Sequence, residues 1–362
     1  TVTVSSTGIL NMSTFSDTVS VFNMSAGSLN GTGTLTATTY GLSGGTLAAN
    51  LGTGTLNSSG TVALNGTTGA TVVNVTAGTL TLGSANRLAD AAAVTVSGGT
   101  LALGANSDTV GAVSLTSGSI TGTTGVLTGS SYAVQGGTIS AILGGSGALT
   151  KTTAGTVTLT NKSTYSGGTT VNAGTLQLSA TPNNGTSTIG TGTLIINTGG
   201  TVLADTVDNQ LGHTSAASIP NVEINGGTFT ASSPSVGGMW VKGITLTGGT
   251  VNGTNGIRTE TAAGSFITTL ASASTATIAA PLTNSMTSLA LTVADGAAAT
   301  DLLISGEIKS TGGINKLGAG TLVLSSANTY TGTTTVSAGV LRLTHGSALG
   351  SSSAVSVTSG AQ

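Results

Sequence analysis

The residue types that could carry chemistry gather between positions 203 and 260. Charged residues make up only 5% of the 362-residue chain, so a segment that holds several of them stands out. Asp205, Glu223 and Lys242 are separated by 18 and 19 residues, a spacing that could place them on adjacent turns of one face. Two carboxyl groups beside a base can perform general acid–base chemistry on a glycosidic bond. The rarer residues of the segment are Asp205, Asp208, His213, Pro220, Glu223, Pro234, Met239, Trp240, Lys242, Arg258 and Glu260.

Three interpretations of this segment stay open. The first is a binding patch for glycans, in which the single tryptophan stacks on a sugar; its residues are Asp205, Asp208, Glu223, Trp240 and Lys242. The second is a carbohydrate-active enzyme, a polysaccharide lyase or hydrolase that uses residues 205–260. The third is a set of longer surface loops whose charges keep them solvated, which is the common role of such residues. We expect no catalytic residue in this chain, so the enzyme is the alternative hypothesis.

Metal and cofactor chemistry find little support in the sequence. Cysteine is absent, which removes thiolate ligands and disulfide scaffolds. The two histidines, His213 and His345, are 132 residues apart and suggest no shared metal site. We therefore expect neither a metal nor a cofactor.

A short repeated phrase predicts the elements that position these residues. Glycine, then threonine or serine, then an aliphatic residue recurs at intervals close to 19, and it usually opens a stretch of alternating polar and aliphatic residues such as 79–82. Alternation places the aliphatic side chains on one face of a strand. The sequence therefore predicts an all-β, right-handed parallel β-helix, or β-solenoid, of about 19 residues per coil. We expect one continuous solenoid over 1–362, with irregular coils and longer loops over 203–260.

A β-sandwich is the competing fold. Asn-Gly pairs, which favour tight hairpins, occur at positions 30, 65, 184 and 225. A sandwich does not require a fixed 19-residue period, so the solenoid is favoured. An ice-binding face of Thr-x-Thr rows is a weaker alternative, because the pattern does not recur in every predicted coil.

A longer repeat links residues 148–178 to residues 313–343. The two segments align without gaps at an offset of 165, with 15 of 31 positions identical. The sequence of the second segment, with Lys316 followed by LGAGTLVLSSANTYTG, resembles the passenger-associated transport repeat of bacterial autotransporters. Identical pairs that we expect to have structural roles are Gly155 and Gly320, Tyr165 and Tyr330, and Gly174 and Gly339.

This resemblance implies a passenger region that is exported across a Gram-negative outer membrane and folds outside the cell. In that family the repeat is tied to secretion and folding rather than to ligand binding. We expect a non-enzymatic surface protein, a β-helical stalk, adhesin or fibre component that is extracellular, at the cell surface or secreted. No translocator barrel is recognisable in the sequence, so we expect a fragment or a chain without one.

Composition limits the partners of the chain. The basic residues are scattered singly and the net charge is −2, so nucleic acid is not expected as a partner. No apolar run is long enough for a membrane span. Neither end carries a polar cap, so we expect either further coils or self-association, end to end or laterally. Cell-surface glycans and neighbouring cells are the other expected partners.

Overall fold

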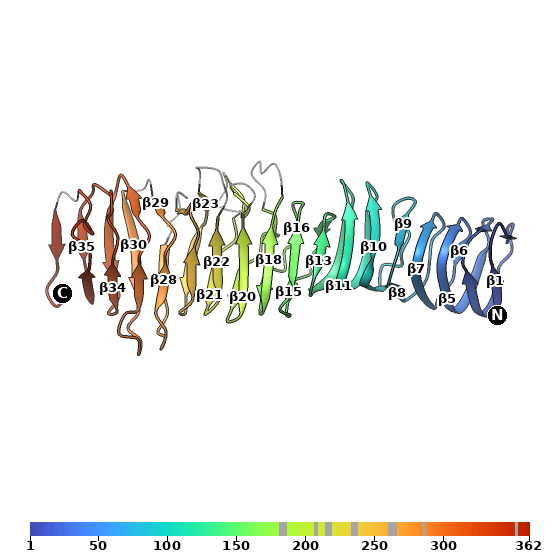
Figure 1. The fold of residues 1–362 in the computed structure, drawn as a ribbon, viewed down its shortest axis with the longest axis horizontal. Helices are drawn as coiled ribbons and strands as arrows, with labels where there is room; N and C mark the ends of the chain where they lie inside the picture. Colours follow the sequence, from blue (N-terminus) through green and yellow to red (C-terminus); the bar gives the residue numbers. More distant parts are fainter. Residues whose placement is uncertain are drawn as a thin grey trace. The chain divides into compact units, whose positions relative to one another are not determined.

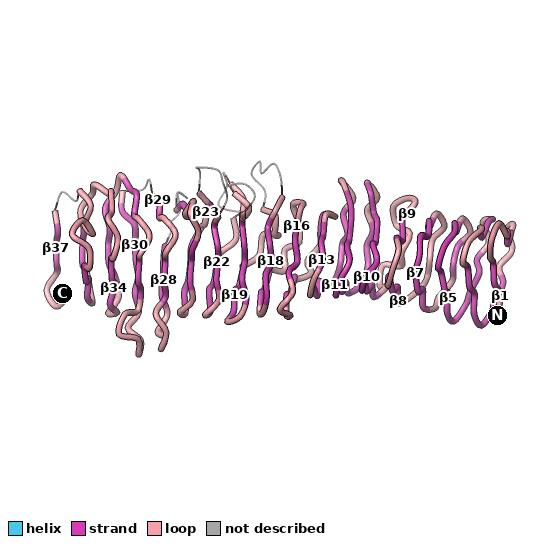
Figure 2. The backbone as a smooth tube through the Cα atoms, in the orientation of Figure 1, coloured by secondary structure: helices cyan, strands magenta, loops and turns pink. Residues whose placement is uncertain are grey.

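The computed structural model describes residues 1–180, 187–205, 209–213, 219–232, 238–259, 266–284, 287–351 and 354–362. The described residues are strands, turns and loops, as the colouring of Figure 2 shows. They contain no helix long and apolar enough to cross a membrane. The chain divides into two compact units, residues 1–167 and 168–362, and the following paragraphs treat each unit by itself. The single continuous solenoid over 1–362 therefore stays a prediction.

The first unit contains the strands from β1 to β16. Their order along the chain can be followed by colour in Figure 1, where some of them are labelled. The first eight are β1 (Val2–Val4), β2 (Ile9–Asn11), β3 (Asp17–Met24), β4 (Ser28–Asn30), β5 (Thr34–Leu47), β6 (Asn50–Leu51), β7 (Thr55–Leu64) and β8 (Val72–Val75). The others are β9 (Thr79–Leu82), β10 (Ala93–Gly104), β11 (Asp108–Gly122), β12 (Val126–Val134), β13 (Gly137–Ile139), β14 (Ile142–Gly144), β15 (Leu149–Lys151) and β16 (Thr156–Leu159).

The second unit contains the strands from β17 to β37. Its first half has β17 (Thr169–Val171), β18 (Gly174–Leu178), β19 (Leu194–Asn197), β20 (Gly200–Ala204), β21 (Val222–Asn225), β22 (Thr228–Ala231), β23 (Met239–Trp240), β24 (Gly243–Leu246), β25 (Thr250–Asn252) and β26 (Ile257–Arg258). Its second half has β27 (Phe266–Thr269), β28 (Ala276–Ile278), β29 (Leu282–Asn284), β30 (Ser288–Val293), β31 (Leu302–Ile304), β32 (Ile308–Ser310), β33 (Gly313–Leu317), β34 (Thr321–Leu324), β35 (Thr334–Val336), β36 (Val340–Leu343) and β37 (Val355–Val357).

Each unit is a parallel β-solenoid, which confirms the predicted fold class, with about 20 residues per turn. In the first unit, β10 pairs in parallel with β9 on one side and with β11 on the other. One inward ladder of the first unit runs through Leu80, Leu101, Ile120, Ile139 and Leu159 in register. Each of these side chains is at most 2% exposed, so the coils stack their aliphatic residues into one narrow core.

The second unit repeats this arrangement with longer coils. Its inward ladder consists of Leu176, Val202, Phe229, Val251 and Ile278, all fully buried. Paired residues here are up to 28 positions apart, as between β19 and β21. The inward ladder is kept, and the extra chain length falls in the links between the strands.

A separate four-stranded parallel sheet, β23-β26-β29-β32, forms another face of the second unit. Trp240, Arg258, Thr283 and Lys309 are partners in register along it. The strands carry buried Met239, Ile257, Leu282 and Ile308 between or beside these residues. Because side chains of a strand alternate, the four partners lie on the outer face.

Glycines of the repeated phrase occupy turns that favour glycine. Gly174 and Gly339 both adopt a φ of +67°, in the left-handed region. A Cβ at Gly339 would lie 2.5 Å from the carbonyl oxygen of Gly320 on the preceding coil. The phrase therefore marks places where backbones of successive coils approach too closely for a side chain.

Candidate binding surface

The outer row of the four-stranded sheet brings together an aromatic side chain, two basic side chains and a hydroxyl. Trp240 is the single tryptophan of the chain, and Arg258 and Lys309 are two of its eight basic residues. In-register pairing puts Arg258 beside Trp240, Thr283 beside Arg258, and Lys309 beside Thr283. Neighbouring strands lie about 4.8 Å apart, so the row presents one side chain per strand step. We call these four residues the Trp240 row.

Trp240 contacts two other side chains of the second unit. The guanidinium carbon of Arg258 lies 5.1 Å from the centroid of the tryptophan ring, which is cation–π geometry. The ring of His213 meets it edge to face, with centroids 4.9 Å apart and an interplanar angle of 85°. All three side chains are partly exposed. These contacts restrict the orientation of the Arg258 guanidinium.

Lys309 ends the row and forms an ion pair with Glu307. Their side-chain atoms Nζ and Oε2 are 3.3 Å apart, and the side chains are 54% and 31% exposed. The other oxygen of Glu307, Oε1, accepts a hydrogen bond from the hydroxyl of Thr329 at 2.9 Å. An exposed pair of this kind contributes little stability and exchanges readily with other ions.

The predicted stack of Asp205, Glu223 and Lys242 does not form. Glu223 lies in β21, where its partners in register are Ile195 and Thr245. Asp205 follows β20, a strand that pairs with β18 and β22 instead. Lys242 lies in the link between β23 and β24. The expectation was wrong because the paired residues here are 22 to 28 positions apart, not 18 or 19.

Asp205 has hydrogen-bonding partners of its own in the second unit. Its Oδ2 accepts a 2.8 Å hydrogen bond from the side-chain amide of Gln177, and its Oδ1 accepts one from the hydroxyl of Ser179 at 3.5 Å. Asp208, the remaining member of the predicted patch, lies outside the described residues, as do Pro234 and Glu260. Trp240 is thus the one predicted patch residue that belongs to the row.

The tyrosines of the two aligned segments are both fully buried. Tyr165 packs against Tyr132 with ring centroids 5.8 Å apart. The hydroxyl of Tyr330 shares a 2.7 Å hydrogen bond with the hydroxyl of Thr334. Burial raises the pKa of Tyr330, and the Thr334 contact partly opposes this rise. Both positions therefore act in packing, consistent with the structural role expected for them.

Two buried lysines were not singled out from the sequence. Lys151 and Lys316 occupy equivalent repeat positions and are fully buried. The ammonium of Lys316 donates hydrogen bonds to the carbonyls of Leu317, Gly318 and Ala338 at 3.1, 2.7 and 3.0 Å. Lys151 donates to the carbonyl of Thr153. The alternation of side chains along the strand could have predicted their burial. Each lysine stands two positions after a buried aliphatic residue, so both side chains point to the inward side of the strand.

A buried carboxylate accompanies Lys316 in the second unit. Asp301 accepts hydrogen bonds from the backbone N–H groups of Gly296 and Thr321 at 2.8 and 2.7 Å. A Cβ at Gly320 would lie 2.8 Å from Asp301 Oδ2, so this predicted repeat glycine leaves room for the carboxylate. Gly155 is similarly close to a neighbouring coil, with its added Cβ 2.9 Å from the carbonyl oxygen of Gln135.

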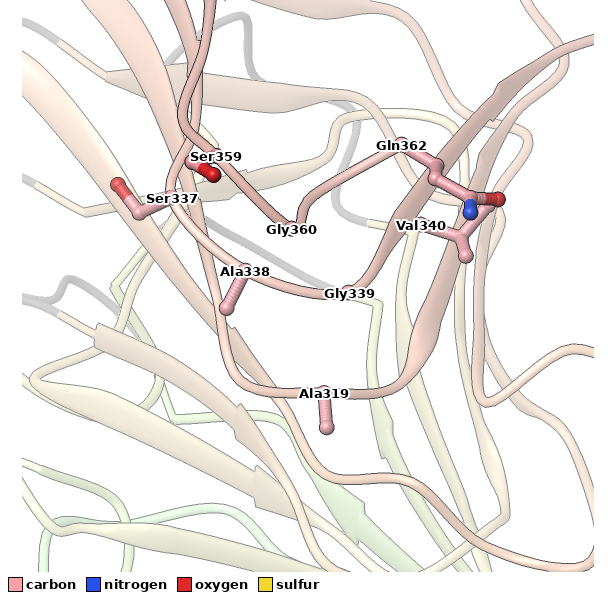
Figure 3. Close-up of a pocket in the computed structure, with 8 residues that line it drawn as sticks. All are labelled: Ala319, Ser337, Ala338, Gly339, Val340, Ser359, Gly360 and Gln362. Carbon is pink, nitrogen blue, oxygen red and sulfur yellow. The ribbon is translucent and has the colours of Figure 1, made fainter.

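An open hollow of about 470 Å³ lies near Lys316, where three successive coils turn (Figure 3). Its lining consists of Ala319, Ser337, Ala338, Gly339, Val340, Ser359, Gly360 and Gln362. None of these side chains is ionisable, so none of them can act as an acid or a base. Within the described parts of the chain, no group of three or more histidine, aspartate or glutamate side chains could hold a metal ion.

Comparison with known families gives three matches in this chain. The model of the passenger-associated-transport-repeat matches residues 77–103, 149–178 and 314–343. The chain carries passenger-associated transport repeats. The second and third repeats coincide with the two segments aligned from the sequence. The first was missed by that alignment.

The first repeat lacks the tyrosine of the other two. Its Ser84-Ala85-Asn86 matches Ser326-Ala327-Asn328, but Leu88 stands where the third repeat has Tyr330. The fold of the two turns is nevertheless alike, since the N–H groups of Asn86 and Asn328 donate 3.0 Å hydrogen bonds to Ser107 and Ser347 of the following coils. Leu88 is only 4% exposed and fills the buried position in place of the tyrosine.

A comparison with curated proteins shows similarity to the "Adhesin BmaC autotransporter" of Brucella suis biovar 1 (strain 1330). The identity is 34% over 237 residues, which is 54% of this chain. The chain spans only 7% of the length of that relative. No solved structure matches the chain. Together the repeats and the relative support an autotransporter passenger region that carries these repeats.

Proposed function

We propose that this chain is a non-enzymatic, adhesive part of an extracellular bacterial surface protein that is exported by an autotransporter-like route. The observation that carries the proposal is the presence of three passenger-associated transport repeats on a parallel β-solenoid. A relative with the word adhesin in its name supports the adhesive role. Cell-surface or secreted localisation is part of this proposal, and the same similarity supports it.

The physical properties of the solenoid fit such a role. Stacked aliphatic ladders stabilise a long surface without a large core, because each coil buries its inward side chains against its neighbours. The outer face then remains available for contacts along its length. The Trp240 row is the described part of the second unit where aromatic and charged groups come together on that face.

The placement of Asp205 and Glu223 argues against the hydrolase form of the alternative, in which these two carboxyl groups would act together. Asp205 and Glu223 belong to different strand ladders, and Asp205 is hydrogen-bonded to Gln177. A glycosidase needs two carboxyl groups that flank the same bond.

Self-association of the chain, side by side or end to end, stays a prediction that sedimentation velocity at increasing concentration can test.

The proposed adhesive role is tested by attachment of the bacterium that carries the chain. We expect a strain in which this segment is deleted from the surface protein to lose attachment to host cells or to sister cells, and expect the restored segment to recover it. The control is surface labelling of the truncated protein with a tag outside the deleted segment, which shows that it is still exported. Unchanged attachment by a strain that exports the truncated protein would overturn the proposal.

A further inference from the structure

We propose that Asn30 is a site of spontaneous deamidation, which converts its side-chain amide to a carboxylate in the folded chain. Asparagine before glycine is suited to this reaction, because no side chain on the next residue hinders the approach of its backbone nitrogen. The chain has six such pairs, whose asparagines stand at positions 30, 65, 184, 225, 252 and 255; position 184 lies outside the described residues. The contacts of the amide and of the next N–H group distinguish Asn30 from the other described pairs.

The reaction needs only water and a free backbone nitrogen. The nitrogen of Gly31 attacks Cγ of Asn30 and loses its proton, and Nδ2 leaves as ammonia, which closes a succinimide ring. Water then opens the ring at either carbonyl and leaves aspartate or isoaspartate, so that the amide and one water become a carboxylate and ammonium. The reaction is therefore favoured where the attacking nitrogen donates no hydrogen bond and the amide is free to rotate.

Both conditions hold at Asn30. The residue ends β4, and its carbonyl oxygen accepts a 2.8 Å hydrogen bond from the N–H of Met12. In the described first unit, neither its side-chain amide nor the N–H of Gly31 has a hydrogen-bonding partner. Asn11, its partner in register, uses its own Oδ1 to accept a 2.8 Å hydrogen bond from the N–H of Ser13. Asn30 and Gly31 are both partly exposed, so water can reach the ring that forms.

Asn65 is a matched comparison within the same unit. Residues 29–32 and residues 64–67 have the identical sequence Leu-Asn-Gly-Thr, so the two asparagines differ only in their folded surroundings. Asn65 is the more exposed of the two, yet the N–H of Gly66 donates a 2.9 Å hydrogen bond to the carbonyl oxygen of Leu47. Attack on Cγ of Asn65 must first break this bond. Exposure alone would make Asn65 the faster site, whereas the hydrogen bond makes it the slower one.

The described pairs of the second unit are restrained in other ways. Nδ2 of Asn225 donates a hydrogen bond to Oδ1 of Asn197 at 3.2 Å, which restricts rotation of the amide. Oδ1 of Asn252 is buried and has no donor among the described residues, so the negative charge that develops on this oxygen during attack is poorly stabilised. Gly256 of the last pair is buried. We expect all three pairs to react more slowly than Asn30.

Deamidation would change one turn of the first unit. Aspartate adds a negative charge to a chain that has only 10 acidic residues. Isoaspartate inserts a methylene group into the backbone next to the turn in which the N–H groups of Thr32 and Gly33 donate to the carbonyl oxygen of Ser13, at 2.6 and 3.0 Å. An aged chain should therefore be more negative and should have a weaker link between these two coils. This inference is independent of the adhesive function.

The test is incubation of the folded 362-residue chain in mildly alkaline buffer at physiological temperature. Mass spectrometry of peptic peptides follows the deamidated fraction of each asparagine over time. Asn30 should react about fivefold faster than Asn65, the ratio expected when one backbone hydrogen bond must first be broken. In concentrated urea the two rates should become equal, because the local sequences are identical and the fold that separates them is lost.

Two variants assign the site. Asn30→Gln should abolish the modification at position 30, because the longer side chain does not close a five-membered ring, and should leave the rate at Asn65 unchanged. Asn65→Gln is the matched control and should leave the rate at Asn30 unchanged. The proposal is overturned if Asn65 reacts as fast as Asn30 in the folded chain, or if Asn30 stays unmodified in the folded chain while both react in urea.

Discussion

The ammonium group of Lys316 donates a 3.0 Å hydrogen bond to the carbonyl oxygen of Ala338, 22 residues further along the chain. The same ammonium reaches the carbonyls of Leu317 and Gly318, so a buried cation links the turns of two successive coils. Burial lowers the pKa of Lys316 from its ordinary value to about 8, while the negative charge of Asp301 opposes the shift. The repeat thus contains an inward lysine whose three N–H groups are all used.

Replacement of this lysine should destabilise the second unit. Lys316→Met removes the donors and leaves buried carbonyls without their partner, which should lower the free energy of unfolding by about 1–3 kcal/mol. Chemical denaturation followed by circular dichroism measures this change. Lys309→Met is the control, because its exposed side chain should change stability by less than about 0.5 kcal/mol. Equal effects of the two variants would contradict the role given to Lys316.

The stability of the chain should rise with pH between about 8 and 10. The pKa of Lys316 in the folded state, about 8, lies below that of the unfolded chain, 10.5, so the unfolded state holds more protons in this range. Burial lowers the pKa of Lys151 as well, which acts in the same direction. The slope should be smaller in Lys316→Met than in the wild type, as measured by denaturation at several pH values. If both proteins gave the same slope, Lys316 would not be the titrating group.

The hydroxyl of Tyr330 should stabilise its coil through Thr334. Tyr330→Phe keeps the ring but removes the 2.7 Å hydrogen bond, and should cost about 1 kcal/mol. Thr334→Val should cost less in this background than it costs in the wild type, because the contact with Tyr330 is already absent. A double-mutant cycle that finds no coupling between the two positions would contradict the contact.

Neighbouring residues of β16 should lose very different amounts of stability when a charge is introduced. Leu159 is 1% exposed and belongs to the inward ladder, so Leu159→Asp buries an unpaired carboxylate and should unfold the first unit or destabilise it by more than about 4 kcal/mol. Thr158 is adjacent and faces outward, so Thr158→Asp should cost about 1 kcal/mol or less. Thermal melts of the two variants measure the difference, and similar melting temperatures would show that the inward assignment is wrong.

The sequence correctly predicted strand burial and coil stacking where the repeated Gly-Thr/Ser-aliphatic motif occurs. Alternation in 79–82 correctly predicted that Leu80 and Leu82 are buried, and the recurring glycine correctly predicted the parallel coils. The same alternation places Lys316 inside, but a lysine is so rarely buried that only its carbonyl partners explain the position.

Prediction failed where coil length varies. The spacing of Asp205 and Glu223 resembles one coil, yet the strand that holds Glu223 pairs 28 residues back, with Ile195, because the coil between them is longer. Trp240 pairs with Arg258 in a second sheet. The register of that sheet could not be predicted, because its strands do not carry the repeated sequence pattern. The lengths of the links between strands therefore decide which residues of the candidate site become neighbours, and the repeated pattern does not predict these lengths.

The central claim, that this chain is part of a passenger exposed outside the cell, is tested most directly by labelling of intact bacteria. Antibodies raised against the 362-residue chain should bind unpermeabilised cells, and brief protease treatment of those cells should remove the signal while a periplasmic marker stays intact. Labelling that requires permeabilisation, or that survives the protease treatment, would contradict the account.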